Sequence, residues 1–452
     1  MKTNPILWQF WNCRLEYRKF HGILLHNMKL KVEKSRLNGT VAIPGSKSHT
    51  IRAVAIASLA EGQSLIRRPL SSSDTLSAVA CYRALGADID TSEPDIWKVT
   101  GTWGKITPPE DVIDVGNSGT TLRIAIGSAA LAPPGKGTTF TGDEQIQSRL
   151  IEPLMNSLNE LGAKCRSLKN NGKAPLEIIG QIKGGKTSIA AFTSQYLSSL
   201  LLCTPLAPAD TEVDVTLLNE PGYVQMTLDW LDKQQIEYEN HQMKKFHVKG
   251  NQKYKAFDLP VAADFSSATF FLCAAALLAD EVTLLGLDFA DSQPDKSVVD
   301  YLKAMGADIQ IEPDSVKIRA SQLKGTEIDM NATPDALPAM AVTAAFAEGE
   351  TRLVNVPQAR NKETDRIACM ATELQKMNVD VEELPDGIII RHSRPKPAQM
   401  HGWGDHRIVM ALSLAAMALD GQCVIDTAEA MNVTFPSFVE LMTSLGAKMK
   451  CE

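Results

Sequence analysis

The sequence predicts an α/β protein of six similar units, grouped as two domains of three units each. Two repeated patterns indicate this architecture. One is a polar or Gly/Pro-rich helix start that recurs every 70 to 76 residues, and the other is a helix end of the form Leu/Met-Gly-Ala. With 452 residues, 44% of them hydrophobic, the chain is long enough for two full cores.

The helix starts precede Ala/Leu-rich runs and are separated by 71, 76, 71, 70 and 71 residues. They begin at Ser46, Asn117, Thr193, Asp264, Pro334 and Asp405. Such a regular period is typical of a repeated supersecondary unit.

The helix ends contain a glycine where a left-handed residue commonly stops a helix. Strong copies lie at Gly86, Gly162, Gly306 and Gly446, with weaker copies at Gln235 and Asn378. Short β-branched runs follow, so each unit is predicted as strand, helix, strand, helix, strand, strand. The natural join between two sets of three units lies near 258–263.

Residues 1–27 differ from the rest, because aromatic and charged residues alternate there without a small-residue cleavage site. We expect a poorly ordered N-terminal extension and no signal peptide. From residue 46 onward the chain is predicted to form the first domain, 46–262, and then the second, 263–452.

Composition excludes several classes of protein. A net charge of -7 and a pI near 5.7 argue against a nucleic-acid or membrane-surface partner. The eight cysteines include no C-x-x-C pair, which predicts a reduced, cytoplasmic protein without a metal cluster. No apolar run reaches the roughly 20 residues of a membrane span.

The repeated helix starts predict a local anion site inside this acidic protein. Free N–H groups at a helix N-terminus attract anions, although capping alone also explains Ser, Thr and Asp there. Arginine favours the anion site because its guanidinium binds carboxylate or phosphate in a bidentate manner. The cations near the helix starts are Lys47, Arg52, Arg123, Arg149, Arg366 and Arg407.

The stretch 361–366 places four ionised side chains before a helix-like run, 367–377. If this stretch is helical, Lys362 and Arg366 share a face and Glu363 lies between them. A carboxylate held between cations is suited to acid/base chemistry. The alternative interpretation is a solvated helix start.

The motifs together resemble the enolpyruvyl transferase family, from about residue 29 to the C-terminus. They are Pro44–Ser48 with Arg52, Gly116–Arg123, Thr141–Asp143 with Arg149, Lys362–Arg366 and Asp405–Arg407. The resemblance implies two domains of three βαβαββ units, of the inside-out α/β barrel type, that close over an active site in the interdomain cleft. It also implies that residues 28–45 join the C-terminal domain.

Among these enzymes, the motifs are most similar to those acting on shikimate 3-phosphate. The implied reaction transfers the enolpyruvyl group of phosphoenolpyruvate to its 5-hydroxyl, without metal or cofactor, in a monomer. Lys47, Asp335 and Glu363 are the implied catalytic residues, with Asp335 assigned to the hydroxyl and Glu363 to C3. Phosphoenolpyruvate is expected among Lys47, Asn117, Gly119, Arg149, Gln195, Arg366 and Arg407, with His406 beside them. Shikimate 3-phosphate is expected against Ser48, Arg52, Thr193, Ser194, Gln195, Asp335, Gln358 and Lys362.

The chain departs from the family pattern at Val433, where a lysine that contacts phosphoenolpyruvate is usual. This leaves a catalytically inactive sugar-phosphate-binding relative as one alternative. A second is the sister enzyme acting on UDP-N-acetylglucosamine, although the loop 133–149 lacks its cysteine. The pattern at 180–187 fits a phosphate loop, but a strand follows where a phosphate loop needs a helix. Residues 183–186 are therefore interpreted as a hairpin turn within a unit.

Overall fold

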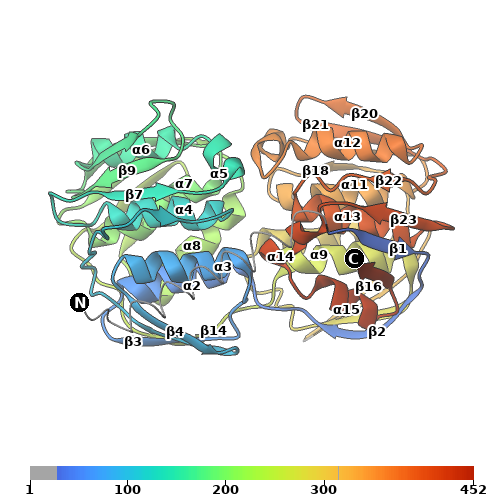
Figure 1. Cartoon of the computed structure of the whole chain (residues 1–452), viewed down its shortest axis with the longest axis horizontal. Coiled ribbons are helices and arrows are strands. Elements are labelled where there is room, and N and C mark those ends of the chain that lie inside the picture. Colours follow the sequence, from blue (N-terminus) through green and yellow to red (C-terminus); the bar gives the residue numbers. More distant parts are fainter. Residues whose placement is uncertain (1–27, 314) are drawn as a thin grey trace, which may run out of the picture.

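The computed structural model describes residues 28–313 and 315–452, arranged as two halves that lie side by side (Figure 1). The extension predicted for 1–27 lies outside the described residues. Within them, six four-stranded sheets are formed, three in each half. The six predicted units and the α/β fold class are therefore confirmed. None of the described helices is both long and apolar enough to cross a bilayer.

Three units form the first half. Unit one contains β14 (Asp258–Pro260), α2 (Lys47–Leu59), β3 (Gln63–Arg67), α3 (Ser73–Ala84), β4 (Asp88–Glu93) and β5 (Ile96–Thr100). Unit two contains β6 (Ile113–Asp114), α4 (Gly119–Ala129), β7 (Thr138–Thr141), α5 (Glu144–Ser148), α6 (Glu152–Glu160), β8 (Lys164–Ser167) and β9 (Leu176–Ile179). Unit three contains β10 (Gly185–Ala191), α7 (Ser194–Cys203), a 3-10 helix (Thr204–Leu206), β11 (Thr211–Leu218), α8 (Pro221–Lys233), β12 (Tyr238–His241) and β13 (Lys245–Val248).

Three more units form the second half. Unit four contains β2 (Leu37–Ala42), α9 (Phe265–Leu278), β15 (Ala279–Leu285), a 3-10 helix (Pro294–Lys296), α10 (Ser297–Ala304), β16 (Asp308–Glu312) and β17 (Ser315–Arg319). Unit five contains β18 (Glu327–Asp329), a 3-10 helix (Pro334–Ala336), α11 (Leu337–Ala345), β19 (Glu350–Val354), a 3-10 helix (Pro357–Asn361), α12 (Arg366–Lys376), β20 (Asp380–Leu384) and β21 (Gly387–Arg391). Unit six contains β22 (Gln399–Met400), α13 (His406–Met417), β23 (Gln422–Ile425), a 3-10 helix (Ala428–Ala430), α14 (Met431–Thr434), α15 (Phe438–Ser444), β24 (Lys448–Cys451) and β1 (Leu30–Glu33).

Every sheet pairs its first two strands in parallel and adds two antiparallel strands. In four sheets a helix connects the parallel pair, as a crossover between parallel strands requires. In unit four, β2 precedes the whole first half and pairs with β15, which follows it. In unit one, β14 comes from the end of the first half and pairs with β3. In unit six, β1 lies between β23 and β24 and pairs with both.

The predicted helix ends are confirmed by backbone geometry. The glycine after the unit's second helix has a positive φ in four units, from +94° at Gly306 to +110° at Gly86. The two weaker copies do the same without glycine, at Gln235 (φ 58°) and Asn378 (φ 65°).

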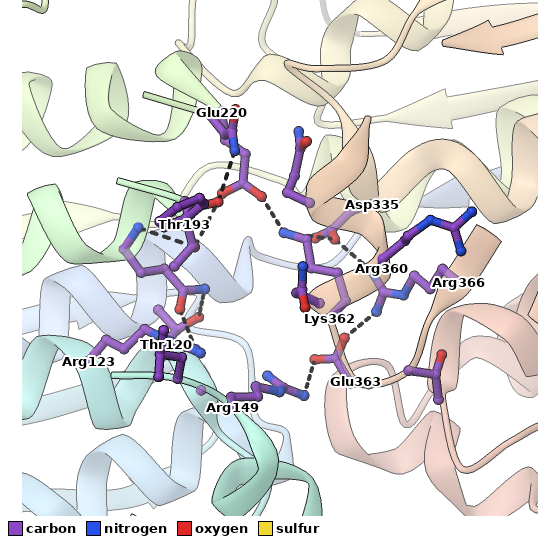
Figure 2. Close-up of a pocket in the computed structure, with 18 of the residues that line it drawn as sticks. Thr120, Arg123, Arg149, Thr193, Glu220, Asp335, Arg360, Lys362, Glu363 and Arg366 are labelled. Atoms are coloured by element: carbon purple, nitrogen blue, oxygen red, sulfur yellow. Dashed lines mark hydrogen bonds and ion pairs between the residues drawn. The ribbon is translucent and has the colours of Figure 1, made fainter. Parts of the chain in front are cut away.

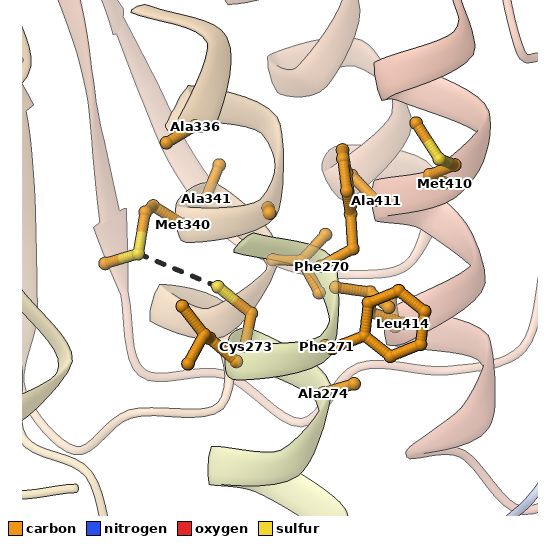
Figure 3. Close-up of a cluster of buried hydrophobic side chains, with 14 of the residues drawn as sticks. Phe270, Phe271, Cys273, Ala274, Ala336, Met340, Ala341, Met410, Ala411 and Leu414 are labelled. Carbon is orange, nitrogen blue, oxygen red and sulfur yellow. Dashed lines mark hydrogen bonds between the residues drawn. The ribbon is translucent and has the colours of Figure 1, made fainter. Parts of the chain in front are cut away.

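Three helices at the centre of each half carry its core. In the second half these are α9, α11 and α13, which pack against one another through small and flexible side chains (Figure 3). Ala341 and Ala411 allow close approach, and Met340 and Phe271 fill the remaining space. Such helices are buried on all sides, which explains why their sequences are apolar throughout.

The two cores do not share residues, which supports a division of the chain into two domains. One core draws on residues between Ile51 and Val261, and the other on residues between Leu30 and Ile43 and between Ala263 and Met449. The blue strands β1 and β2 accordingly lie among the elements of the second half (Figure 1). We propose the boundaries 46–262 for the first domain and 28–45 with 263–452 for the second.

Two local expectations were wrong. Residues 183–186 are not a hairpin turn within a unit, because β10 begins at Gly185 and the strands on either side, β9 and β10, belong to different sheets. Likewise, 362–365 is not helical: a 3-10 helix ends at Asn361, α12 begins at Arg366, and Asp365 caps α12 by accepting a hydrogen bond from the N–H of Ala368 (3.0 Å). The pattern misled because Asp365 is a better N-cap than helix interior residue.

Polar contacts join the halves near the chain crossings. His49 Nε2 lies 3.1 Å from Asp291 Oδ1, and Tyr223 donates its hydroxyl proton to Asp295 Oδ2 at 2.6 Å. Burial raises the pKa of Asp295 to about 7, and the nearby Asp335 carboxylate adds to this. The pKa of Asp291 falls to about 2, because its bonds to His49 and Gln293 outweigh its burial.

We predict that Phe271→Ala lowers the free energy of unfolding by about 3–5 kcal/mol, because it leaves a cavity among α9, Phe435 and Phe438. Urea unfolding measures this loss. Ile311→Ala is the control, since Ile311 is 44% exposed and should change stability by only about 0.5 kcal/mol. Equal losses in both variants would contradict this description of the core.

We predict that Asp295→Asn stabilises the protein at pH 8 by roughly 1–3 kcal/mol. The folded pKa of Asp295, about 7, exceeds its ordinary value of 3.8, so the wild type loses stability as pH rises from about 4 to 7. The gain should therefore vanish below pH 4.

Asp291→Asn provides a control of opposite sign. Its folded pKa is depressed, so the wild-type carboxylate stabilises the protein at neutral pH and loses this effect as the pH falls toward 2. Urea unfolding at pH 8 should therefore show that Asp295→Asn is more stable and Asp291→Asn less stable than the wild type. Changes in the same direction for both variants would contradict the assignment.

Candidate active site

A cavity of about 820 Å³ lies between the two halves. Helix starts from both halves and the segment 357–366 contribute to its wall (Figure 2). The predicted residues that line it are Lys47, Gly119, Arg149, Thr193, Gln195, Asp335, Gln358, Lys362, Glu363, Arg366, His406 and Arg407.

Capping residues fix the helix starts that reach this cavity. Thr193 caps α7, and Asp405 caps α13 by accepting a hydrogen bond from the N–H of Arg407 at 2.9 Å. Because a cap satisfies only part of the first turn, the remaining N–H groups stay available to a ligand. The start of α9 does not line the cavity, and the side chain of Gln293 accepts the N–H of Phe265 there (3.0 Å).

Arg366 is the centre of the second-half wall, with only 1% of its surface exposed. Its Nε lies 2.8 Å from Asp405 Oδ2, and its NH1 lies 2.7 Å from Asp335 Oδ1. Its NH2 also binds Glu363 Oε2. One guanidinium therefore orients two cavity carboxylates and is itself held by a third.

The cations around the two cavity carboxylates keep both ionised. Burial would raise the pKa of Asp335, but Arg407, Lys362 and other nearby cations hold it far below its usual range. Glu363 is buried too, and Arg366 and Arg149 hold its pKa well below normal. Arg149 reaches Glu363 from the opposite half, with NH2 3.3 Å from Oε1.

Lys47 remains charged in this setting. Its Nζ lies 3.1 Å from Asp74 Oδ2, and although burial opposes the charge, Asp74 raises the pKa of Lys47 above its ordinary value. His406 behaves differently, because burial lowers its pKa to about 3 despite the nearby carboxylates. Its imidazole is therefore neutral, and Nε2 has no hydrogen-bond partner within the described residues.

The first half contributes two converging guanidiniums above Gly119. A Cβ atom on Gly119 would lie 2.5 Å from NH1 of Arg123 and 2.8 Å from NH1 of Arg149. Arg123 also donates to Gln195 Oε1 at 2.8 Å. The Nε groups of both arginines are buried without a hydrogen-bond partner in the described chain. This is an anion site that only a residue without a side chain leaves open.

The carboxylate of Glu220 accepts hydrogen bonds from a second group of donors. Glu220 Oε2 accepts from Ser194 Oγ at 2.8 Å, from the Ser194 N–H at 3.2 Å and from Thr193 Oγ1 at 3.4 Å. Its other oxygen binds Lys362 Nζ, so this contact also joins the two halves (Figure 2).

Four predicted residues lie outside the lining of the cavity: Ser48, Arg52, Asn117 and Ser194. Arg52 is 1% exposed, and its guanidinium donates to Thr227 Oγ1 and to the Tyr223 carbonyl, both at 2.9 Å. Burial lowers its pKa to about 10. The Asn117 amide donates to Asp143 and Gln145 at 2.6 and 2.7 Å.

The sequence did not single out Asp74, Glu220 and Arg360, which also line the cavity. No motif marks Asp74 or Glu220, because each is defined by a partner distant in the chain. Val433 does not line the cavity. Among the described residues, no group of three or more His, Cys, Asp and Glu side chains is placed to bind a metal ion.

Comparisons with known proteins show which family the chain resembles. The family model described as EPSP synthase (3-phosphoshikimate 1-carboxyvinyltransferase) matches residues 32–442. The 3-phosphoshikimate 1-carboxyvinyltransferase of Acetivibrio thermocellus is 55% identical over 94% of this chain and all of its own length. That of Ruminiclostridium cellulolyticum is 52% identical over 94% of this chain and 100% of its own.

Solved structures support the same assignment. EPSP synthase from Acinetobacter baumannii superimposes with a TM-score of 0.79 at 26% identity, covering 94% of this chain and 100% of its own. The enolpyruvyl transferase NikO from Streptomyces tendae, 18% identical with a TM-score of 0.74, covers 94% and 99% and shares the fold. The six-unit fold, the matched family model and the relatives above 50% identity lead to one conclusion: the chain belongs to the EPSP synthase family.

Proposed function

We propose that the protein transfers the enolpyruvyl group of phosphoenolpyruvate to the 5-hydroxyl of shikimate 3-phosphate and releases phosphate. The observation that carries this proposal is the Arg366 cluster, which presents Asp335 and Glu363 side by side in a cavity rich in cations. Addition and elimination at an enol phosphate need a base, an acid and positive charge, and this wall supplies all three.

The reaction consists of an addition followed by an elimination. In the first, the 5-hydroxyl loses its proton to Asp335, its oxygen bonds to C2 of phosphoenolpyruvate, and C3 gains a proton from Glu363, which takes up a proton from solvent once the bound anions raise its pKa. In the second, C3 returns that proton and the bond between C2 and the phosphate oxygen breaks. Lys47 is placed to protonate the departing phosphate. These steps balance through proton transfer alone, so no redox or organic cofactor is involved.

The substrates themselves adjust the acidity of the two carboxylates. In the empty cavity the surrounding cations make Asp335 and Glu363 weak bases. Bound phosphate and carboxylate groups neutralise part of that positive charge, so the pKa of each carboxyl rises toward the range useful for proton transfer.

The same charges support a placement for each substrate. Phosphoenolpyruvate lies near Gly119, between Arg149 of the first half and Arg366 and Arg407 of the second. Shikimate 3-phosphate lies toward Thr193, Lys362 and Asp335, with its hydroxyl at Asp335. We assign Ser48, Arg52 and Asn117 as supporting residues at the margins of these sites, and Ser194 as a donor beside Thr193.

We further propose that the enzyme works in the cytoplasm as a monomer, without a nucleic-acid partner. The cysteines that the structure describes are free thiols, and most of them are buried. Reduced thiols of this kind are typical of a cytoplasmic protein.

We predict that Glu363→Gln lowers kcat for phosphate release by about 10²–10⁴-fold, because the amide cannot deliver a proton to C3. Phosphate is measured with both substrates present and with each one omitted. Exchange of solvent deuterium into C3 of phosphoenolpyruvate should fall in parallel. Glu382→Gln, on the exposed strand β20, is the matched control.

Three results would contradict these assignments. Phosphate release that did not require shikimate 3-phosphate, or that required UDP-N-acetylglucosamine, would contradict the proposed substrate. No release from folded wild-type protein would favour the inactive relative. Unchanged deuterium exchange in Glu363→Gln would remove Glu363 from the protonation of C3.

We predict that Gly119→Ala raises KM for phosphoenolpyruvate by about tenfold or more, because its Cβ forces the guanidiniums of Arg123 and Arg149 apart. Steady-state kinetics measures this change, and the melting temperature should stay near that of the wild type. In Gly127→Ala, on the same helix, the Cβ would lie 2.4 Å from Ser199 Oγ in the core, so stability should fall instead. An unchanged KM in Gly119→Ala would place the anion elsewhere.

A further inference from the structure

Glu220 is a buried carboxylate in the wall of the cavity, with 2% of its surface exposed. The donors that its two oxygens contact lie close together at this part of the wall. Thr193 and Ser194 donate to one oxygen, and Lys362 of the opposite half binds the other. Figure 2 shows Glu220 between Thr193 and Lys362.

These donors form an anion site in their own right. Ser194 is the first residue of α7, a helix of 10 residues, so its N–H belongs to the unpaired first turn. A helix N-terminus combined with a hydroxyl and a lysine is suited to a phosphate group. The structure therefore contains a phosphate-type site that the chain fills with its own carboxylate.

The backbone conformation of Glu220 indicates that the surrounding donors hold its carboxylate in this site. Glu220 has φ 58° and ψ 49°, a left-handed conformation that is uncommon outside glycine and asparagine. It also precedes Pro221, which disfavours helical conformations in the preceding residue. Strained backbone of this kind persists only where the surrounding structure holds it, and it is concentrated at ligand sites and switches.

We propose that Glu220 is an internal competitor for the phosphate group of the phosphorylated substrate. Its carboxylate holds Thr193, Ser194 and Lys362 in the empty cleft and withdraws when the phosphate binds. This inference rests on the proposed function in taking shikimate 3-phosphate as that substrate.

Charge explains why both anions do not bind together. A carboxylate beside a phosphate of nearly two negative charges would leave one Lys362 ammonium facing two anions, in a buried setting where repulsion is strong. Displacement therefore costs affinity, and a ligand without a phosphate leaves Glu220 in place. The apparent affinity for the phosphorylated substrate equals the intrinsic affinity multiplied by the fraction of molecules in which Glu220 has withdrawn from these donors.

The test compares wild type with Glu220→Gln and Glu220→Gly. The first removes the charge at nearly constant size, and the second also relieves the left-handed backbone. Both should lower the Kd and KM for shikimate 3-phosphate by about tenfold. The kcat and the KM for phosphoenolpyruvate should stay within about twofold.

Glu160→Gln is the matched control. Glu160 Oε2 accepts from Thr187 Oγ1 at 2.6 Å and from the Ser188 N–H at 3.3 Å, a similar arrangement away from the cavity. Its loss should leave both constants for shikimate 3-phosphate unchanged.

A separate measurement does not depend on catalysis. Inorganic phosphate alone should raise the melting temperature of Glu220→Gln at about tenfold lower concentration than it does for the wild type. If the wild type shows no transfer activity but this shift is seen, the proposed function is contradicted, whereas competition between Glu220 and phosphate is supported.

Three outcomes would overturn the proposal. Weaker binding of shikimate 3-phosphate in Glu220→Gln, with a lower melting temperature, would show that Glu220 positions Lys362 and does not compete with phosphate. Unchanged binding would show that phosphate does not compete with it. Tighter binding in Glu220→Gly alone would assign the effect to the backbone and not to the carboxylate.

Discussion

The structure of the cleft depends on one buried guanidinium. Arg366 has almost no contact with solvent, and its charge is stable there because Asp335, Glu363 and Asp405 surround it. Removing such charges from water costs several kcal/mol for each ion, which the mutual attraction must offset. The ionisation states of Arg366 and its three carboxylate partners therefore depend on one another.

The repeat explains how that cluster is assembled and what faces it. Units five and six deliver Asp335, Asp405 and Arg366 from helix starts, and unit three delivers the donors of α7 in the same way. Arg149 of unit two instead follows the C-terminus of α5 and reaches Glu363 from there. The empty cleft neutralises its cations with internal carboxylates such as Glu363 and Glu220. Anionic substrates then exchange one set of ion pairs for another, so they do not meet isolated buried charges.

Local patterns explain what the sequence could predict. The unit period, the helix starts and the helix ends at Gly86 or Gly306 depend on neighbouring residues, and the structure agrees with them. Partners far apart in the chain escaped prediction, such as Asp74 for Lys47 and Glu220 for Ser194. The helical placement of Lys362 failed because two rules competed, and the capping preference of Asp365 prevailed over periodicity.

The strands β1 and β2 affect the order in which the protein can be built. They precede the first half in the chain, yet β1 pairs with β23 and β24, which follow nearly all of the second half. The first half needs only contiguous residues, so it can fold while synthesis continues, whereas β1 stays unpaired until nearly the whole chain has emerged. During that interval, the unpaired backbone groups of β1 are exposed to other chains. Because of this topology, the second half is expected to fold more slowly than the first half and to be more prone to aggregation.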